Sequence, residues 1–213
     1  MVGSKQPSPV WLSPEEADRH CRAGASVWQF CSTNKGVDPD VVICGIGAEM
    51  MFEVVAAAAI LRRIAPELKV RVVNVTDLMV LGEIGSHPHA LTPDDFNAIF
   101  TEDKSIHFNY HGMPMLNLKL IVGYRTELQG LLFHRPNLDR VSVEGYNEEG
   151  TTTTPFCMML LNHTSRFDVA IAAVSGAKGN PEIQVKRQQL LASLRHAIKK
   201  AQVSHPSSRR ACV

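Results

Sequence analysis

The strongest constraint on the fold is a strand, a helix and a second strand in the first third of the chain. Residues 41–44 (Val-Val-Ile-Cys) are a continuous apolar run, which is typical of a strand buried on both faces of a parallel sheet. The alanine-rich segment 49–64 predicts a helix that ends before Pro66, and the valine-rich segment 70–75 predicts the next strand. Strand, helix and strand within about 35 residues predict a right-handed βαβ unit.

Helix-start signals divide the rest of the chain into elements of the same two kinds. Ser13, Pro14 and Glu16 form a capping box with proline at the first helical position. Residues 26–31 give no clear pattern. The predicted helices are 13–24, 49–64, one capped by Thr92, 128–133, one starting at Pro155, 165–174 and 181–202, and the predicted strands are 41–44, 70–75, 106–110 and 141–145. Because strands and helices alternate, we expect a three-layer α/β domain.

The composition excludes several classes of protein. The 22 Lys and Arg residues nearly balance the 21 Asp and Glu residues, so we expect no concentrated basic surface for a nucleic acid. No run approaches the roughly 18 apolar residues that indicate a membrane span. The five cysteines are odd in number and form no Cys-x-x-Cys pair, which argues against a disulfide framework and a zinc knuckle. A reducing, cytoplasmic location is therefore expected.

Gly45-Ile46-Gly47 stands where a dinucleotide-binding fingerprint would begin, between the first strand and its helix. Met50 occupies the place of the third glycine, and the carboxylate of Glu49 would repel a pyrophosphate. A tight strand-to-helix turn explains the two glycines equally well. The sequence therefore disfavours nucleotide binding at this turn.

Four of the nine histidines stand in pairs that suggest a metal site. His87 and His89 are so close in the chain that we expect their imidazoles not to share one ion. His107 and His111 would lie on one face of a strand, roughly 13 Å apart, which is too far for a single metal. We therefore predict no metal ligands, and interpret these histidines as loop and strand-end residues that hydrogen-bond to the backbone.

The segment 148–155 combines two glutamates, a glycine, four threonines and a proline directly after a predicted strand. The threonines could donate hydrogen bonds to an anion, or Thr154 could cap the helix that begins at Pro155. The two carboxylates would repel a phosphate, so the structural interpretation is favoured. No residue is predicted to be catalytic or to bind a cofactor. The candidates for a domain interface or a ligand-facing surface are His111, Glu148, Glu149, Thr151, Thr152, Thr153 and Thr154.

Several strings occur in a fixed order along almost the whole chain, from about residue 6 to residue 174. Together they resemble the C-terminal domain of phosphoketolases. The strings are residues 11–13 (Trp-Leu-Ser), 40–42 (Asp-Val-Val), 66–75 (Pro-Glu-Leu-Lys-Val-Arg-Val-Val-Asn-Val), 77–79 (Asp-Leu-Met), 87–89 (His-Pro-His), 100–104 (Phe-Thr-Glu-Asp-Lys), 110–112 (Tyr-His-Gly) and 148–156 (Glu-Glu-Gly-Thr-Thr-Thr-Thr-Pro-Phe).

This resemblance implies a fold and an activity. The fold would be that of the transketolase C-terminal domain, a mixed, mostly parallel five-stranded sheet with one antiparallel edge strand. The parent enzyme would use thiamine diphosphate and Mg²⁺ to cleave xylulose 5-phosphate or fructose 6-phosphate with phosphate, releasing acetyl phosphate. The cofactor would lie between two preceding domains. The Gly-Asp-Gly signature for its diphosphate is absent here, so this chain is expected to bind no cofactor.

The resemblance leaves two hypotheses for the chain. It is either the structural, dimer-forming C-terminal domain of a phosphoketolase, inactive alone, or a stand-alone ligand-binding or regulatory module. As a fragment it would be about the last quarter of such an enzyme, from a cloned domain or a truncated gene model. We divide it into a linker or arm (1–12), the domain (13–203) and a disordered tail (204–213).

Two departures from the family pattern stand out. Cys157 replaces an aspartate. Residues 113–123 are also predicted to be an insertion, because they separate the His-Gly pair from Tyr124. The alternative is that residues 116–122 extend the following helix, since leucine and lysine are good helix formers.

Overall fold

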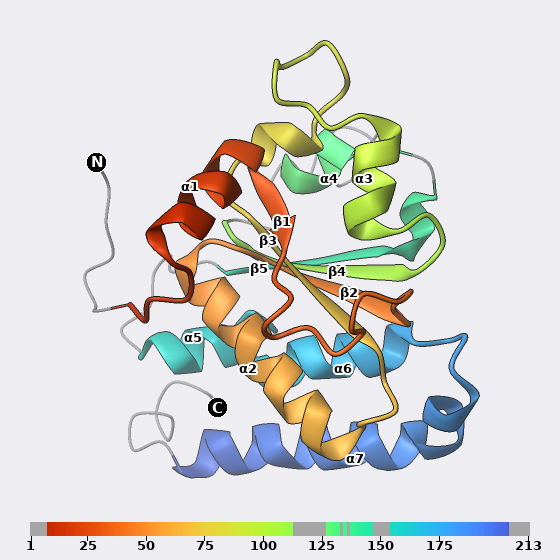
Figure 1. The fold of residues 1–213 in the computed structure, drawn as a ribbon. Helices are drawn as coiled ribbons and strands as arrows, with labels where there is room; N and C mark the ends of the chain where they lie inside the picture. The colour runs from red at the N-terminus through yellow and green to blue at the C-terminus, as the bar shows by residue number, and fades with distance from the viewer. Residues whose placement is uncertain (1–7, 113–126, 133, 136, 147–153, 205–213) are drawn as a thin grey trace, which may run out of the picture.

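A mixed five-stranded sheet with helices on both faces forms the centre of the molecule (Figure 1). The computed structural model describes residues 8–112, 127–132, 134–135, 137–146 and 154–204. The strands lie in the order β1-β3-β2-β4-β5. They are β1 Ala25–Val27, β2 Val41–Ile46, β3 Val70–Val75, β4 Ser105–His111 and β5 Val141–Tyr146.

The parallel part of the sheet follows from the apolar runs of the sequence. β2 pairs in parallel with β3 on one side and with β4 on the other, and β4 pairs in parallel with β5. All six residues of β2 are buried, as predicted for a strand that is covered on both faces. β1 runs antiparallel to β3 and comes from the segment whose pattern was ambiguous. The expected mixed sheet with one antiparallel edge strand is confirmed.

Two sets of helices cover the two faces of the sheet. α2, α6 and α7 share a core with the side chains of Val41, Ile43 and Val72, while α3 and α4 pack on the side of Val42 and Phe108. α7 lies against α6 on the side away from the sheet, so one face carries an additional layer (Figure 1). The helices are α1 Pro14–Ala23, α2 Ala48–Ile64, α3 Pro93–Phe100, α4 Glu127–Leu132, α5 Pro155–Leu161, α6 Arg166–Gly176 and α7 Pro181–Ser204, with 3-10 helices η1 Leu78–Leu81 and η2 Leu138–Arg140.

The helix starts are those that the sequence predicted. The Ser13 side chain accepts from the backbone N–H of Glu16, and the Glu16 carboxylate accepts from that of Ser13, which completes the capping box. Thr92 caps α3, and Thr154 caps α5 by accepting from the backbone N–H of Cys157. Each cap satisfies a backbone donor that the first turn of a helix would otherwise leave without a partner.

Replacing Thr154 by alanine should lower the free energy of unfolding by about 1 kcal/mol, the usual cost of losing a helix N-cap. The hydrogen bond that would be lost is the one from Cys157 N–H to the Thr154 hydroxyl, at 3.3 Å. Urea denaturation of the two proteins measures the difference. Thr154→Ser keeps the hydroxyl and should keep most of the stability. An unchanged urea midpoint for Thr154→Ala would contradict the capping role.

Several predictions fall on residues that the structure does not describe. These are the arm up to residue 7, the insertion 113–123, and the tail, of which only Ser204 is described as the last residue of α7. Trp11 and Leu12, at the end of the predicted arm, pack against the core of α2, α6 and α7. In the described part of the chain, no helix combines the length and the apolar character that crossing a membrane requires.

Candidate functional site

The carboxyl ends of the four parallel strands, β2 to β5, meet at one edge of the sheet. β2 connects through α2 to β3 on one side, and the chain then crosses to β4 on the other side of β2. β2 and β4 therefore border the point where the strand order reverses, which is where open α/β sheets bind their ligands. Gly47 directly follows β2, and His111 is the last residue of β4. These two residues define the candidate site.

Gly47 and His111 approach each other so closely that only glycine fits at position 47. Gly47 has φ +95° and ψ 151°, a conformation that is essentially confined to glycine. A Cβ atom at this position would lie 2.5 Å from the Cβ of His111. The interpretation of these glycines as a tight strand-to-helix turn is confirmed, since a Cβ on Gly45 would likewise lie 2.8 Å from the Cα of Met51.

An exposed acid–base pair lies at this edge. The Nδ1 atom of His111 is 3.1 Å from Oε2 of Glu49, in the first turn of α2, and both side chains are more than one third exposed. The imidazole also contacts the ring of Tyr146 edge-on, with centroids 5.2 Å apart. Because the Glu49 carboxylate offsets the positive end of α2, the site disfavours phosphate and can accept hydrogen bonds or hold a cation.

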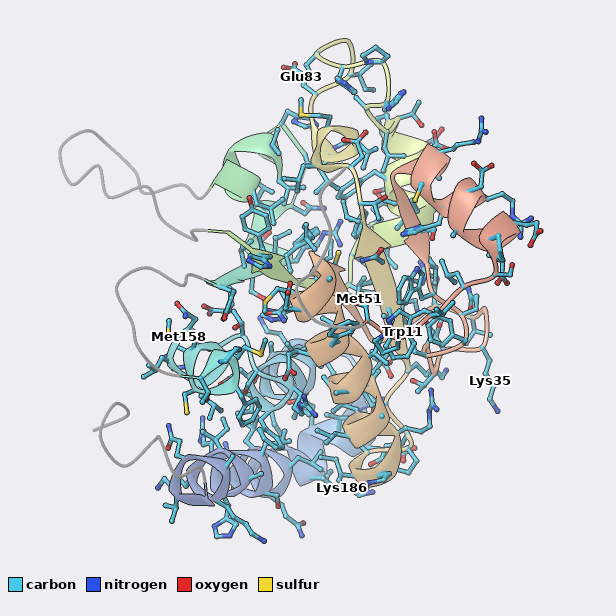
Figure 2. All side chains as sticks on the ribbon, turned by 90° about the vertical axis from the view of Figure 1, so that its left-hand side faces the viewer. Trp11, Lys35, Met51, Glu83, Met158 and Lys186 are labelled. Carbon is cyan, nitrogen blue, oxygen red and sulfur yellow. The ribbon has the colours of Figure 1, made fainter. Side chains whose placement is uncertain are left out.

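A cavity of about 520 Å³ extends from this edge towards the N-terminal segment. Trp11 and Trp28 form part of its wall, and their ring centroids are 6.4 Å apart. Figure 2 shows Trp11 on the same side of the molecule as Met51 of α2, which also lines the cavity. Among the described residues, the buried indole N–H groups of both tryptophans have no hydrogen-bond partner. The cavity therefore has an aromatic wall, and the two indole N–H groups are buried within the wall.

Asn74 lines the cavity and is joined by hydrogen bonds to two further polar side chains, His20 and Ser26. Ser26 Oγ lies 2.6 Å from Nδ1 of His20, and Nε2 of His20 lies 2.6 Å from Oδ1 of Asn74. Asn74 in turn donates to the backbone carbonyl of Gly45 at 3.1 Å. Sequence reasoning missed these residues, although an asparagine inside the apolar run 70–75 was a signal for them.

The structure places the other sequence candidates as follows. Thr154 caps α5, while Glu148, Glu149, Thr151, Thr152 and Thr153 lie outside the described residues. The segment that holds these five residues is flanked by Tyr146 of β5, which contacts His111, and by Thr154. Thr154 itself is structural, and His111 is the candidate that lies at the edge of the sheet.

Of the four histidines singled out in the sequence, three have side-chain partners, whereas backbone partners were expected. His107 is buried and its Nδ1 atom is 2.9 Å from the Ser142 hydroxyl, and this burial lowers the pKa of His107 to about 4. His111 has a different partner, the carboxylate of Glu49. His87 and His89, by contrast, lie beside Asp77. The loop turns so that the two rings are perpendicular. The short spacing of His87 and His89 in the sequence did not predict this conformation.

Comparison with known proteins places the chain in one family. The family model described as "XFP C-terminal domain" matches residues 5–208. A probable phosphoketolase of Schizosaccharomyces pombe is 53% identical over 192 residues, which cover 90% of this chain and 22% of that protein. Probable phosphoketolase 1 of Rhizobium meliloti is 46% identical over 167 residues, covering 78% of this chain and 20% of that protein. The chain thus spans about a fifth of the length of these relatives.

Solved structures of transketolases are also similar to the chain. The inactive beta4 tetramer of a split-gene transketolase is 16% identical with a TM-score of 0.47, covering 81% of this chain and 48% of that one. The transketolase from Leishmania mexicana is 14% identical with a TM-score of 0.46, covering 76% of this chain and 19% of that one.

Proposed function

The chain belongs to the phosphoketolase family, as its C-terminal domain, and we propose that it completes a thiamine-diphosphate-dependent phosphoketolase without being catalytic alone. The observation that carries this proposal is the family match over residues 5–208, together with 53% identity to a probable phosphoketolase. The proposed reaction is the phosphate-dependent cleavage of xylulose 5-phosphate or fructose 6-phosphate to acetyl phosphate. The proposed location is the cytoplasm, which the scattered free cysteines favour.

The described residues of this chain do not fit thiamine diphosphate and its Mg²⁺. Mg²⁺ prefers oxygen ligands and is held by carboxylates and phosphates. Within the described residues, the one group of three metal-ligating side chains contains two imidazoles, and the carboxylate at the carboxyl edge of the sheet faces His111. The Gly-Asp-Gly signature is absent from the sequence. The cofactor is therefore assigned to the preceding domains of the parent enzyme, and no catalytic step is assigned to this chain.

The proposed role of this domain is to support the preceding domains and a homodimer of the parent enzyme through the carboxyl edge of its sheet. His111 and Glu49 form an exposed polar pair at the point where the strand order reverses, where α/β domains meet ligands and neighbouring domains. Glu148, Glu149, Thr151, Thr152 and Thr153 are proposed to extend this contact surface, with Thr154 at its end.

A second candidate function is that of a stand-alone ligand-binding module. The cavity beside Trp11 and Trp28 favours it, because an aromatic wall with few polar groups is typical of a small-molecule site. The two candidates differ in a simple way. A supporting domain needs the rest of the enzyme, whereas a binding module works by itself.

A domain-replacement experiment tests the proposed function. The S. pombe relative is made intact, truncated before its matching region, and as a chimera in which this chain replaces that region. Truncation should lower acetyl phosphate formation at least about 100-fold, since small misplacements of catalytic groups already cost that much. The chimera should recover most of the activity. A truncated enzyme that keeps full activity would show that the domain is not required.

Two controls sharpen this experiment. A chimera without residues 113–123, in which Gly112 joins Tyr124, should be at least as active and as soluble if the segment is an insertion. Calorimetry of the isolated chain with thiamine diphosphate and Mg²⁺ should detect no saturable binding. Micromolar binding by the isolated chain would favour the stand-alone module instead.

A further inference from the structure

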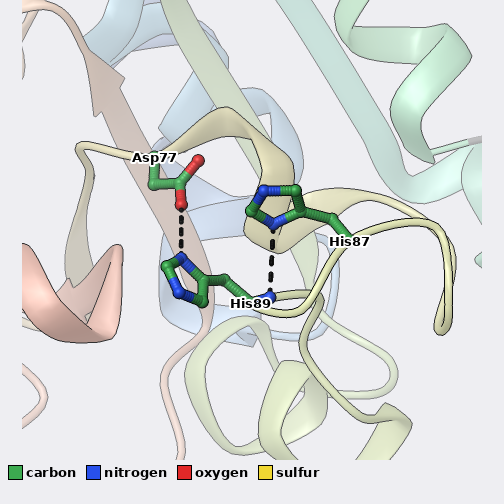
Figure 3. A group of neighbouring side chains, drawn as sticks. All are labelled: Asp77, His87 and His89. Carbon is green, nitrogen blue, oxygen red and sulfur yellow. Dashed lines mark hydrogen bonds and ion pairs between the residues drawn. The ribbon is translucent and has the colours of Figure 1, made fainter.

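Three side chains with metal-ligating atoms converge beyond the end of β3. They are Asp77, His87 and His89, and one ligand atom of each lies within 4.8 Å of the other two. Figure 3 shows the Asp77 carboxylate pointing towards the ring of His89, and the ring of His87 beside the backbone of His89. The group lies apart from the Gly47 and His111 site, and the proposed function makes no use of it.

Hydrogen bonds hold each of the three side chains in place. Asp77 caps η1 through Oδ1, which accepts from the backbone N–H of Met79 at 2.9 Å. Its Oδ2 atom is 3.2 Å from Nδ1 of His89. Nδ1 of His87 accepts from the backbone N–H of His89 at 3.2 Å, and the two rings are perpendicular with centroids 5.1 Å apart. One carboxylate oxygen is thus fixed by the backbone, and the other faces an imidazole.

The loop that carries the two histidines is closed at its base. Arg135, a buried residue, donates to the carbonyl oxygens of Gly82 at 3.1 Å and Leu91 at 2.9 Å. The backbone N–H of Leu91 also donates to the carbonyl of Val80 at 2.9 Å. Because both ends of the loop are tied to η1, His87 and His89 are held beside Asp77 before any ion arrives, which lowers the entropic cost of binding.

We propose that Asp77, His87 and His89 form a binding site for a divalent transition-metal ion of the Zn²⁺ class. Two imidazoles and one carboxylate suit zinc and its first-row neighbours, whereas Mg²⁺ and Ca²⁺ prefer oxygen ligands. Three protein ligands leave a fourth tetrahedral position for water. The bound ion would fasten the loop 82–91 to η1 at the edge of the sheet.

The observed spacing needs only a small adjustment to accept such an ion. Zinc–ligand distances of about 2.1 Å place tetrahedral ligands ~3.4 Å apart. The present ligand atoms lie within 4.8 Å of one another, so the most distant pair must close by at most about 1.4 Å. His89 is the most exposed of the three, with 63% of its side chain accessible, and can rotate towards the other two ligands. The ion would replace the proton that His89 now shares with Asp77.

Metal titration of the 213-residue chain without a purification tag tests the site. Equilibrium dialysis with Zn²⁺ should show one equivalent bound, and Co²⁺ should give the visible absorption of a low-symmetry site. Asp77→Asn, which keeps an oxygen for capping η1, and His89→Gln should each weaken binding at least about 100-fold. Loss of an outer-shell partner alone costs 10–100-fold, and these residues contact the ion directly. Mg²⁺ should not compete.

A matched control separates this site from ordinary surface histidines. His163 is 73% exposed with its Nδ1 atom 3.7 Å from Asp168. Within the part of the chain that the structure describes, this similar pair belongs to no group of three metal-ligating side chains. His163→Asn should leave Zn²⁺ binding unchanged, and asparagine suits the positive φ of this position. Zinc binding that survives in the triple variant Asp77→Asn, His87→Gln and His89→Gln would overturn the proposal. The proposal would also be overturned if the unaltered chain, shown to be folded by a cooperative melting transition, did not bind one equivalent of Zn²⁺.

Discussion

Replacing Arg166 by methionine should lower the free energy of unfolding by about 3–5 kcal/mol, because it leaves a buried carboxylate without its partner. Glu53 of α2 is only 3% exposed. Its Oε2 atom accepts from the backbone N–H of Arg166 at 2.6 Å and from Nε at 3.0 Å, and Oε1 accepts from Nη2 at 2.5 Å. These bonds raise the pKa of Arg166 and join α2 to the start of α6.

The reverse substitution should be milder, and the comparison tests the explanation. In Glu53→Met the guanidinium of Arg166 can turn to water, since 39% of that side chain is already exposed. The double variant Glu53→Met with Arg166→Met should recover much of the stability, because a buried ion pair can often be replaced by apolar side chains. Urea denaturation of all four proteins gives the coupling energy. Equal losses in the two single variants would contradict the asymmetry.

Local signals explain why so much of the fold was predictable. The buried strand β2, the capping box at Ser13 and the cap at Thr154 each depend on a few neighbouring residues, and the structure has them as predicted. β1 has only three residues, too few for a periodic pattern, and it forms by pairing with β3. The mixed sheet with an antiparallel edge was expected from the family resemblance, not from periodicity.

The side-chain networks were not predictable, because their members are far apart in the sequence. Glu53 and Arg166 are 113 residues apart, and His20 and Asn74 are 54 apart. At the candidate site the sequence singled out His111 but not Glu49 as its partner. The loop 82–91 illustrates the same limit, since the short spacing of His87 and His89 hid a conformation that brings both to Asp77.

Replacing Gly47 by alanine should lower the free energy of unfolding by about 2–6 kcal/mol, for two independent reasons. The backbone conformation at Gly47 is strained for any other residue, at a cost of about 1–3 kcal/mol. The new methyl group would lie 2.5 Å from the Cβ of His111, so β4 and the turn must move apart, which adds the usual 1–3 kcal/mol of overpacking, roughly. Urea denaturation measures the sum.

Gly36 provides the control that separates the two causes. It has φ +79°, and a Cβ atom there would have no heavy atom within 4 Å. Gly36→Ala should therefore show only the backbone cost of a positive φ, roughly 1–2 kcal/mol. The excess loss in Gly47→Ala contains the overpacking against His111, together with the difference in backbone cost between the two positions. If the two variants lose equal stability, a methyl group at position 47 does not overpack against His111, and this part of the explanation is wrong.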